Sequence, residues 1–491
     1  MQYQHTAAQP RTIRQDMSYA DAIRPVRNQM RKFSYGSVLR QLSTYLSHTG
    51  GAAEVARAKR MPWVAERLAL WALRDRPSMY SGPSMQPADL RKCMDLAWRQ
   101  MNTAVTWTRP GNPLDLMIRS LLLAQAPHQM SKGTGAFARQ IDLIRRISPE
   151  SKLYRSISNA LGLPPMTYLQ LAVFVWHLAE ERIEDLFAPL YMQSLANAFG
   201  KETVGRFLST IMLPRERVVA EMGTIEEDEW FQPNLLYRTP FTLYQNEWYF
   251  WGRPGLQRHL EFAFSDIVAR VEDVGVRQAF EGAFEDYVGD SLGRSGLTVL
   301  NEGEIKRRFA VVGLCNDFAI LEGSVVVLLE AKNKALAHTV TASGTAKTYQ
   351  SKFRATVVKA EVQLDNVANY VRADAALSQA TIHRVVVTYG DLMLGSAQYL
   401  FESGEERDRP LVFSIDQLDQ LLEVVRAGRC TIGDFFDDYY ERQRVPQMRV
   451  FSPGQLLQQP PYMSDEHPKH LQDIFDPFFE GIVNLVDTEN A

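Results

Sequence analysis

The sequence predicts an α+β protein, in which an all-α N-terminal domain precedes a domain of alternating strands and helices. Residues 17–225 carry apolar side chains at three-to-four spacing in one segment after another, which is the period of amphipathic helices. From about residue 275, runs rich in β-branched residues alternate with helical patterns. The chain has 491 residues, of which 45% are hydrophobic, so two or three domains with ample cores are expected.

The helical N-terminal domain is assigned to residues 1–225. Its clearest helical segments are 61–75, 87–105, 113–126 and 166–200. Residues 1–180 hold 24 Lys and Arg against 11 Asp and Glu, whereas the other 311 residues hold 30 against 46. Basic side chains neutralise phosphates, so this half is a candidate for nucleic-acid contact. Attraction between the oppositely charged halves is the alternative, and a protein partner or self-association through this domain is a further expectation.

Residues 226–270 are predicted to form an aromatic β-hairpin and a connecting helix. Two alternating runs meet at Gln245-Asn246, and Asn tolerates the positive φ of a tight hairpin turn. The aromatic run Trp248–Trp251 has the chemistry to stack on bases. A hydrophobic floor between two domains is the preferred interpretation.

The alternating domain is assigned to residues 271–445. It begins with a helix that carries Phe280, Phe284, Val288 and Leu292 on one face and stops at Gly293. Strands are expected near 297–300, within the stretches 309–321 and 324–333, and near 382–390 and 410–415, with helices over 359–377 and 416–428. The Pro-rich remainder, residues 446–491, is predicted to be an extended tail that wraps the body or contacts partners.

The stretch NDFAILEGSVVVLLEAKN, residues 316–333, places charged residues at the end of an apolar strand. Gly323-Ser324 fits a two-residue hairpin turn of type II′. That turn makes Asp317 and Glu330 cross-strand partners, with Cβ atoms about 4.5–5.5 Å apart. Lys332 lies on the same face, two residues further on. The alternative is a solvated strand end where these charges form an ion-pair cluster.

Two facing carboxylates repel, so one of them must hold a proton or a cation must lie between them. Mg²⁺, with Mn²⁺ as the alternative, takes hard oxygen ligands, which Asp317, Glu330 and the backbone carbonyl of Ala331 supply. Lys332 would orient a metal-bound water or neutralise the charge on a phosphate under attack. A second Glu-x-Lys, at Glu304–Lys306, has no upstream Asp placed by a hairpin and is set aside.

Asp317, Glu330 and Lys332 resemble the motif of the PD-(D/E)XK nucleases, which have the restriction-endonuclease-like fold. In that family, a helix bearing a Glu precedes a mixed sheet, an Asp lies on the second strand, and (D/E)-x-K ends the third. The resemblance covers about residues 275–425. It implies an α/β/α domain with a central mixed sheet and a metal-dependent nuclease activity.

The resemblance also implies further site residues. Glu285 corresponds to the helix Glu, which serves as a further metal ligand or orders a water, and Glu281 is its rival one turn earlier. Gln363 corresponds to the residue that the helix after the third strand contributes. Asn316 replaces the Pro of the family motif, which is not a metal ligand.

Taken together, these features predict a Mg²⁺-dependent nuclease that hydrolyses DNA, in a prokaryotic anti-phage defence or DNA-processing role. RNA as substrate, or a non-catalytic nucleic-acid-binding or scaffold protein, are the alternatives. The widely spaced Cys93, Cys315 and Cys430 fit a reduced cytoplasmic chain without disulfides or zinc. No apolar run is long enough for a bilayer crossing, so no membrane association is expected.

Overall fold

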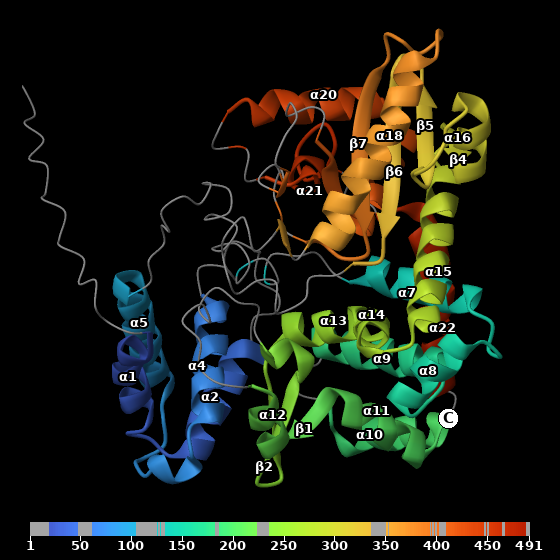
Figure 1. Cartoon of the computed structure of the whole chain (residues 1–491). Coiled ribbons are helices and arrows are strands. Elements are labelled where there is room, and N and C mark those ends of the chain that lie inside the picture. The colour runs from blue at the N-terminus through green and yellow to red at the C-terminus, as the bar shows by residue number, and fades with distance from the viewer. Residues whose placement is uncertain are drawn as a thin grey trace, which may run out of the picture.

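The computed structural model describes most of the chain. The described residues are 19–47, 61–104, 125, 128, 133–181, 186–222, 235–334, 350–351, 353–392, 394, 397, 400–401, 409–445, 448, 451–463 and 467–487. Their arrangement is mixed α and β, with two separate mixed sheets (Figure 1). None of the described helices combines the length and the apolar composition that a membrane crossing requires.

The first helical body contains α1 (Tyr19–Met30), α2 (Tyr35–Ser47), α4 (Pro62–Arg74) and α5 (Pro87–Ala104), with the short η1 (Pro77–Met79) between α4 and α5. Their apolar faces form one core, because residues such as Val38, Leu68 and Trp71 are fully buried. Tyr249 and Trp251 from the aromatic hairpin enter the same core. This body therefore includes side chains from outside the predicted N-terminal domain.

The second helical body shares its core with the C-terminal half of the chain. Its helices are α7 (Thr134–Arg146), α8 (Lys152–Leu161), α9 (Pro165–Glu181), α10 (Pro189–Phe199) and α11 (Lys201–Ile211). The next helix, α12 (Arg215–Glu221), buries Val218 in the core of the first body instead. Phe137 and Tyr168 of this body belong to the same buried cluster as Tyr287, Phe413 and Phe475. The helices predicted within 1–225 thus divide between two hydrophobic cores.

The aromatic hairpin is confirmed. Strand β2 (Phe241–Tyr244) pairs antiparallel with β3 (Glu247–Phe250), and the turn residues Gln245 and Asn246 have φ values of 50° and 63°. Two positive φ values are what a type I′ turn requires. Trp251 is buried and donates from Nε1 to Oγ1 of Thr242 at 2.7 Å, so it serves as core rather than as a surface for bases.

Two predictions for this part of the chain are wrong in detail. A short strand β1 (Met212–Pro214), inside the region predicted to be all-α, adds parallel to β2. Tertiary pairing fixes this strand, since three residues carry little local signal. The single connecting helix is two helices, α13 (Arg253–Glu261) and α14 (Ala263–Arg270).

The five-stranded sheet has the order β4-β5-β6-β7-β8 and is mixed, as expected. The strands are β4 (Thr298–Asn301), β5 (Phe318–Glu322), β6 (Val325–Lys332), β7 (Thr381–Thr388) and β8 (Leu411–Ser414). Strand β5 is antiparallel to both β4 and β6, whereas β6, β7 and β8 are parallel to one another. The predicted register of the β5–β6 hairpin is confirmed, because Glu322 pairs with Val325 and Phe318 with Leu329.

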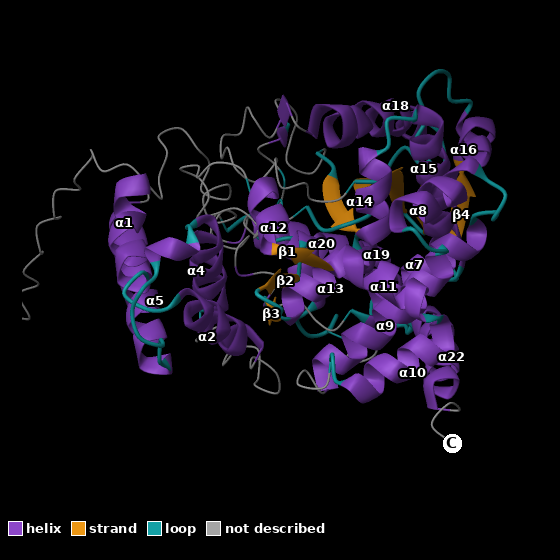
Figure 2. Ribbon diagram, turned by 90° about the horizontal axis from the view of Figure 1, so that it is seen from below, coloured by secondary structure: helices purple, strands orange, loops and turns teal. Residues whose placement is uncertain are grey.

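Helices cover both faces of this sheet. Val327 and Leu329 of β6 join the core that includes α15 (Val274–Gly293) and α19 (Ile415–Arg426). The alternate residues Val326 and Leu328 join a second core with α16 (Glu302–Phe309) and α18 (Lys359–Ala373). Figure 2 shows strands of the sheet lying between α18 and α19. A single π-helical turn, η7 (Arg354–Val358), precedes α18.

The prediction of an extended C-terminal tail is wrong for most of its described residues. After α20 (Ile432–Gln443), the chain forms the short α21 (Pro453–Leu457) and the long α22 (Lys469–Asp487). Leu471, Phe475, Ile482 and Val486 of α22 are buried in the large core. Their three-to-four spacing packs α22 on α7 and α9.

Candidate active site at the end of strand β6

The candidate site lies where β6 ends and β5 begins. Glu330 follows a run of apolar residues buried in the two cores and is itself only 1% exposed. Asp317 directly precedes β5, and its Oδ2 accepts a hydrogen bond from the backbone N–H of Ala331 at 2.7 Å. The structure therefore brings the two predicted carboxylates to the same end of the hairpin. Asp317 lies one residue beyond the ladder and reaches the β6 backbone with its side chain.

Lys332 contacts Glu330 of this pair. Its Nζ forms an ion pair with Oε1 of Glu330, while its side chain remains 23% exposed and reaches solvent. Within the described part of the chain, Oε2 of Glu330 is buried and has no hydrogen-bond partner of ordinary geometry. A buried carboxylate oxygen without a donor is costly, because desolvation is not compensated.

The electrostatics of the pair follow from burial. Burial, followed by the nearby Asp317 carboxylate, raises the pKa of Glu330 to about 7, although Lys332 and Gln363 act in the opposite direction. Burial also raises the pKa of Asp317, against the effect of the Ala331 N–H and of Lys332. One ammonium group is thus near the buried Glu330 and the half-buried Asp317, and a further cation would complete the neutralisation.

Helix α15 places Glu285 beside Asp317. The helix is capped by Asp273, whose side chain accepts from the N–H groups of Gly275 and Val276. Close to the site, Gly289 lets the helix approach β5, since a Cβ there would lie 3.0 Å from the ring of Phe318. The pKa of Glu285 is raised to about 7 by desolvation and then by the charge of Asp317. This effect of Asp317 favours Glu285 over its rival one turn earlier as the acid that belongs to the site.

Helix α18 contributes Gln363. Its Nε2 donates to the carbonyl of Cys315 at 3.1 Å, and the side chain is close enough to Glu330 to lower the pKa of that acid. One turn later, Asn366 donates from Nδ2 to the carbonyls of Val312 (3.2 Å) and Leu314 (2.5 Å). The helix therefore holds the segment that leads into Asp317.

One acidic residue of this neighbourhood was not predicted. Glu302, the first residue of α16, raises the pKa of both Asp317 and Glu285 through its charge. Strand β4 pairs Asn301 with Phe318, so the next position along each strand brings Glu302 towards Asp317. The register of β4 against β5 is the signal that would have identified it.

Asn316, which stands in place of the family's Pro, has a structural role. Its buried Nδ2 donates to the carbonyls of Phe318 (2.6 Å) and Leu329 (3.3 Å), which are on opposite strands of the hairpin. The side chain thus ties β5 to β6 directly beside Asp317.

The residues present fit a hard cation only in part. Across the described residues, no three His, Cys, Asp or Glu side chains converge closely enough to hold a metal ion, so Asp317, Glu330 and Glu285 do not form a ready three-carboxylate site. Two carboxylates with a backbone carbonyl and waters remain compatible with Mg²⁺. A strand residue presents its N–H and C=O to the same side, so the carbonyl of Ala331 faces the Asp317 side. The buried Oε1 of Gln363, like Oε2 of Glu330, has no donor among the described residues.

The basic residues between β6 and α18, which could bind a nucleic-acid backbone, are described only in part. Lys347 and Lys352 lie outside the described residues, whereas Arg354 is exposed at the start of η7. In the N-terminal body, Arg27 and Arg31 pair with the buried Asp75, the latter at 2.6 Å. Part of the N-terminal positive charge is therefore neutralised within the protein.

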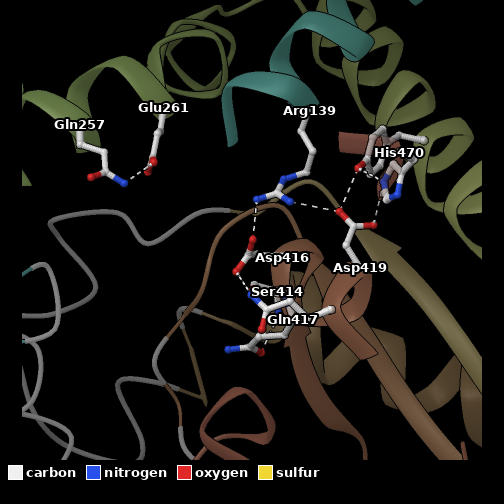
Figure 3. Close-up of polar contacts among 10 residues, drawn as sticks. Arg139, Gln257, Glu261, Ser414, Asp416, Gln417, Asp419 and His470 are labelled. Carbon is white, nitrogen blue, oxygen red and sulfur yellow. Dashed lines mark hydrogen bonds and ion pairs between the residues drawn. The ribbon is translucent and has the colours of Figure 1, made fainter. Parts of the chain in front are cut away.

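A buried ion cluster connects the site helix to the rest of the large core (Figure 3). Arg139 of α7 pairs with Asp416 at 2.8 Å and with Asp419 at 3.1 Å, both on α19. Asp419 also accepts a hydrogen bond from the hydroxyl of Tyr287 at 2.9 Å and faces His470 of α22 at 3.8 Å. Because Tyr287 follows Glu285 by two residues on α15, the cluster fixes the helix that carries the third acid.

The comparisons with known proteins give no relative. No family model matches the chain, and neither a curated protein nor a solved structure matches it at a significant level.

Proposed function

We propose that the chain is a Mg²⁺-dependent nuclease that hydrolyses phosphodiester bonds of DNA. The observation that carries this proposal is the buried Glu330, whose raised pKa and unpartnered oxygen lie beside Asp317 and Lys332 at the end of β6. Fold stability gains little from a buried and a half-buried acid beside one Lys, whereas a phosphate-cleaving site uses all three groups.

The order of elements supports the proposal. Helix α15 with Glu285 precedes β4, Asp317 introduces the second strand, Glu330 and Lys332 end the third, and α18 with Gln363 follows. This is the arrangement that the resemblance to the PD-(D/E)XK nucleases implies. That resemblance also extends the proposal to an effector in prokaryotic anti-phage defence or DNA processing.

In this mechanism, Asp317, Glu330 and the carbonyl of Ala331 would hold the metal ion. Mg²⁺, when bound, supplies a Lewis acid that polarises the phosphate and lowers the pKa of its water. The ammonium of Lys332 would leave Glu330, orient the attacking water and neutralise the charge that develops on the phosphate. Glu285, whose pKa of about 7 suits proton exchange near neutral pH, would exchange a proton with a water at the edge of the site.

A second candidate function is supported by the ion pair between Lys332 and Glu330 and by the lack of a three-acid group among the described residues. Both features would be retained in a non-catalytic nucleic-acid-binding or scaffold protein.

A substrate panel distinguishes the candidates. The purified protein is incubated with plasmid, linear duplex, single-stranded DNA and RNA, each with Mg²⁺, Mn²⁺ or EDTA. We expect cleavage of DNA, and EDTA should abolish it. Cleavage of RNA alone would change the proposed substrate to RNA. Binding without cleavage of any substrate would favour the second candidate.

Titration calorimetry should show weaker Mg²⁺ binding by Asp317→Asn, and an unchanged affinity would contradict the role of Asp317 as a metal ligand.

A further inference from the structure

The segment Lys306–Leu314, here called the α16–β5 segment, combines positive charge with an exposed apolar tip. Lys306, Arg307 and Arg308 form the exposed basic last turn of α16. Val312 and Leu314 follow in the loop and are 74% and 50% exposed. Single exposed apolar residues are ordinary on protein surfaces, but two within three residues beside a basic turn form a distinct surface.

The apolar tip is held in a defined conformation. Gly313 has a φ of 84°, and Val311 and Cys315, two residues away on either side, are buried. The carbonyls of Val312 and Leu314 both accept hydrogen bonds from Asn366 of α18. The backbone is therefore anchored on both sides while the two side chains point out of the core.

A third exposed apolar residue lies on the anchoring helix. Val362 is 53% exposed and precedes Asn366 by four residues, which places the two on the same side of α18. Because Asn366 holds the tip, Val362 extends the apolar surface from the loop onto the helix.

The tip lies close to the candidate site. Leu314 precedes Asp317 by three residues, so an extended chain limits their Cα separation to about 11 Å. That length corresponds to roughly three steps of 3.4 Å along a DNA strand. Gln363, which contacts Glu330, also holds Cys315 between the tip and Asp317.

The charge of the basic turn is available to a polyanion. Lys306 pairs with Glu302 on its own helix, whereas Arg307 and Arg308 have no ion-pair partner among the described residues. These two exposed guanidinium groups are therefore free to donate hydrogen bonds to backbone phosphates.

We propose that the α16–β5 segment is a DNA-contacting element that distorts the duplex at the cleavage position. Arg307 and Arg308 bind backbone phosphates, and Val312 and Leu314 enter the minor groove as an apolar wedge against the base step. Duplexes that unstack at low cost, such as those with a TA step or a mismatch, are then preferred substrates. This inference rests on the proposed nuclease function, which it deepens by naming the substrate contact.

The test measures base unstacking apart from cleavage. Duplex DNA carrying 2-aminopurine at successive positions is mixed with protein in which Lys332→Met prevents turnover, with Mg²⁺ present. Fluorescence should rise at one or two neighbouring positions. In the same background, Val312→Ser combined with Leu314→Ser should remove that rise, whereas the matched exposed control Leu190→Ser, on α10, should keep it. Circular dichroism confirms that each variant is folded.

The Arg variants and the active enzyme complete the test. Arg307→Gln with Arg308→Gln should weaken binding to all duplexes alike and lower the salt slope of log K by about 2. In otherwise wild-type protein, the tip variant should lose about five-fold or more of the preference for a mismatched over a matched duplex, in line with one lost apolar contact at about 1 kcal/mol or more.

The outcomes separate the two proposals. Unchanged fluorescence and preference in the tip variant, with cleavage by the wild type intact, would overturn the wedge and leave the nuclease proposal standing. Failure of the wild type to cleave any nucleic acid would overturn the nuclease proposal, and the fluorescence would still decide whether the tip contacts DNA. A tip that affects only the binding of a protein or of RNA would also overturn the inference.

Discussion

Replacing Glu330 with Gln separates a functional carboxylate from a structural ion pair. Glu330 is 1% exposed, and burial together with Asp317 raises its pKa from 4.5 to about 7. One unit of pKa corresponds to about 1.4 kcal/mol, so ionised Glu330 costs the folded state on the order of 3 kcal/mol. The neutral amide of Gln, which has nearly the same shape, removes this cost.

The size of the stabilisation by Glu330→Gln depends on pH. Because the pKa of Glu330 is raised in the folded state, the protein loses stability as Glu330 ionises. Its stability is at its full value below about pH 4.5, where Glu330 is protonated in both states, and falls as the pH rises through about 7. At pH 5, Glu330→Gln should raise the free energy of unfolding by less than about 1 kcal/mol. At pH 8.5 it should raise it by about 2–3 kcal/mol, because Lys332, which is 23% exposed, can direct its freed ammonium into water.

Calorimetry in EDTA at both pH values is the assay. A gain of about 2 kcal/mol raises Tm by roughly 4–8 °C for a cooperative unit of 150–250 residues. The control Glu281→Gln, an exposed acid on α15, should leave Tm unchanged. A variant less stable than the wild type at pH 8.5 would refute the reasoning, since the ion pair with Lys332 would then be a net stabilising contact.

Two further predictions concern the elements that hold the site. Arg139→Met should lower the free energy of unfolding by about 3–5 kcal/mol, because it leaves Asp419 buried and ionised without its main partner, and an unchanged urea midpoint would disprove it. Gly289→Val should force α15 away from Phe318 at a cost of about 1–3 kcal/mol and reduce Mg²⁺-dependent cleavage. Gly282→Ala, where no atom lies within 4 Å of the added Cβ, is the control, and equal cleavage rates for both variants would contradict the positioning role.

The hairpin that forms the site could be predicted because local chemistry and register agree. Gly323, which has a φ of 60°, fixes the turn, and the two-residue period of strands then aligns Asp317 with the end of β6. Glu302 could not be found in the same way, because it approaches Asp317 only through the pairing of β4 with β5. Long-range pairing of this kind leaves no local pattern.

The C-terminal tail and the division between the hydrophobic cores also could not be predicted from local sequence patterns. Proline content suggested an extended tail, yet Leu471, Phe475 and Ile482 carry a helical period that packs α22 on α7. Helical spacing identified the N-terminal helices but not which of them share a core. The division between the two bodies depends on tertiary partners such as Trp251 and Tyr287, which lie far away in the sequence.

The most direct test of the central claim is the rate of DNA cleavage by the wild type and by Lys332→Met in Mg²⁺. The control Lys201→Met replaces an exposed lysine at the start of α11. We expect the wild type and the control to cleave DNA, and EDTA should abolish cleavage by both. The cleavage rate of Lys332→Met should be lower by about 100-fold or more, as expected when a group that stabilises transition-state charge is removed. Equal rates for Lys332→Met and the wild type would contradict the account.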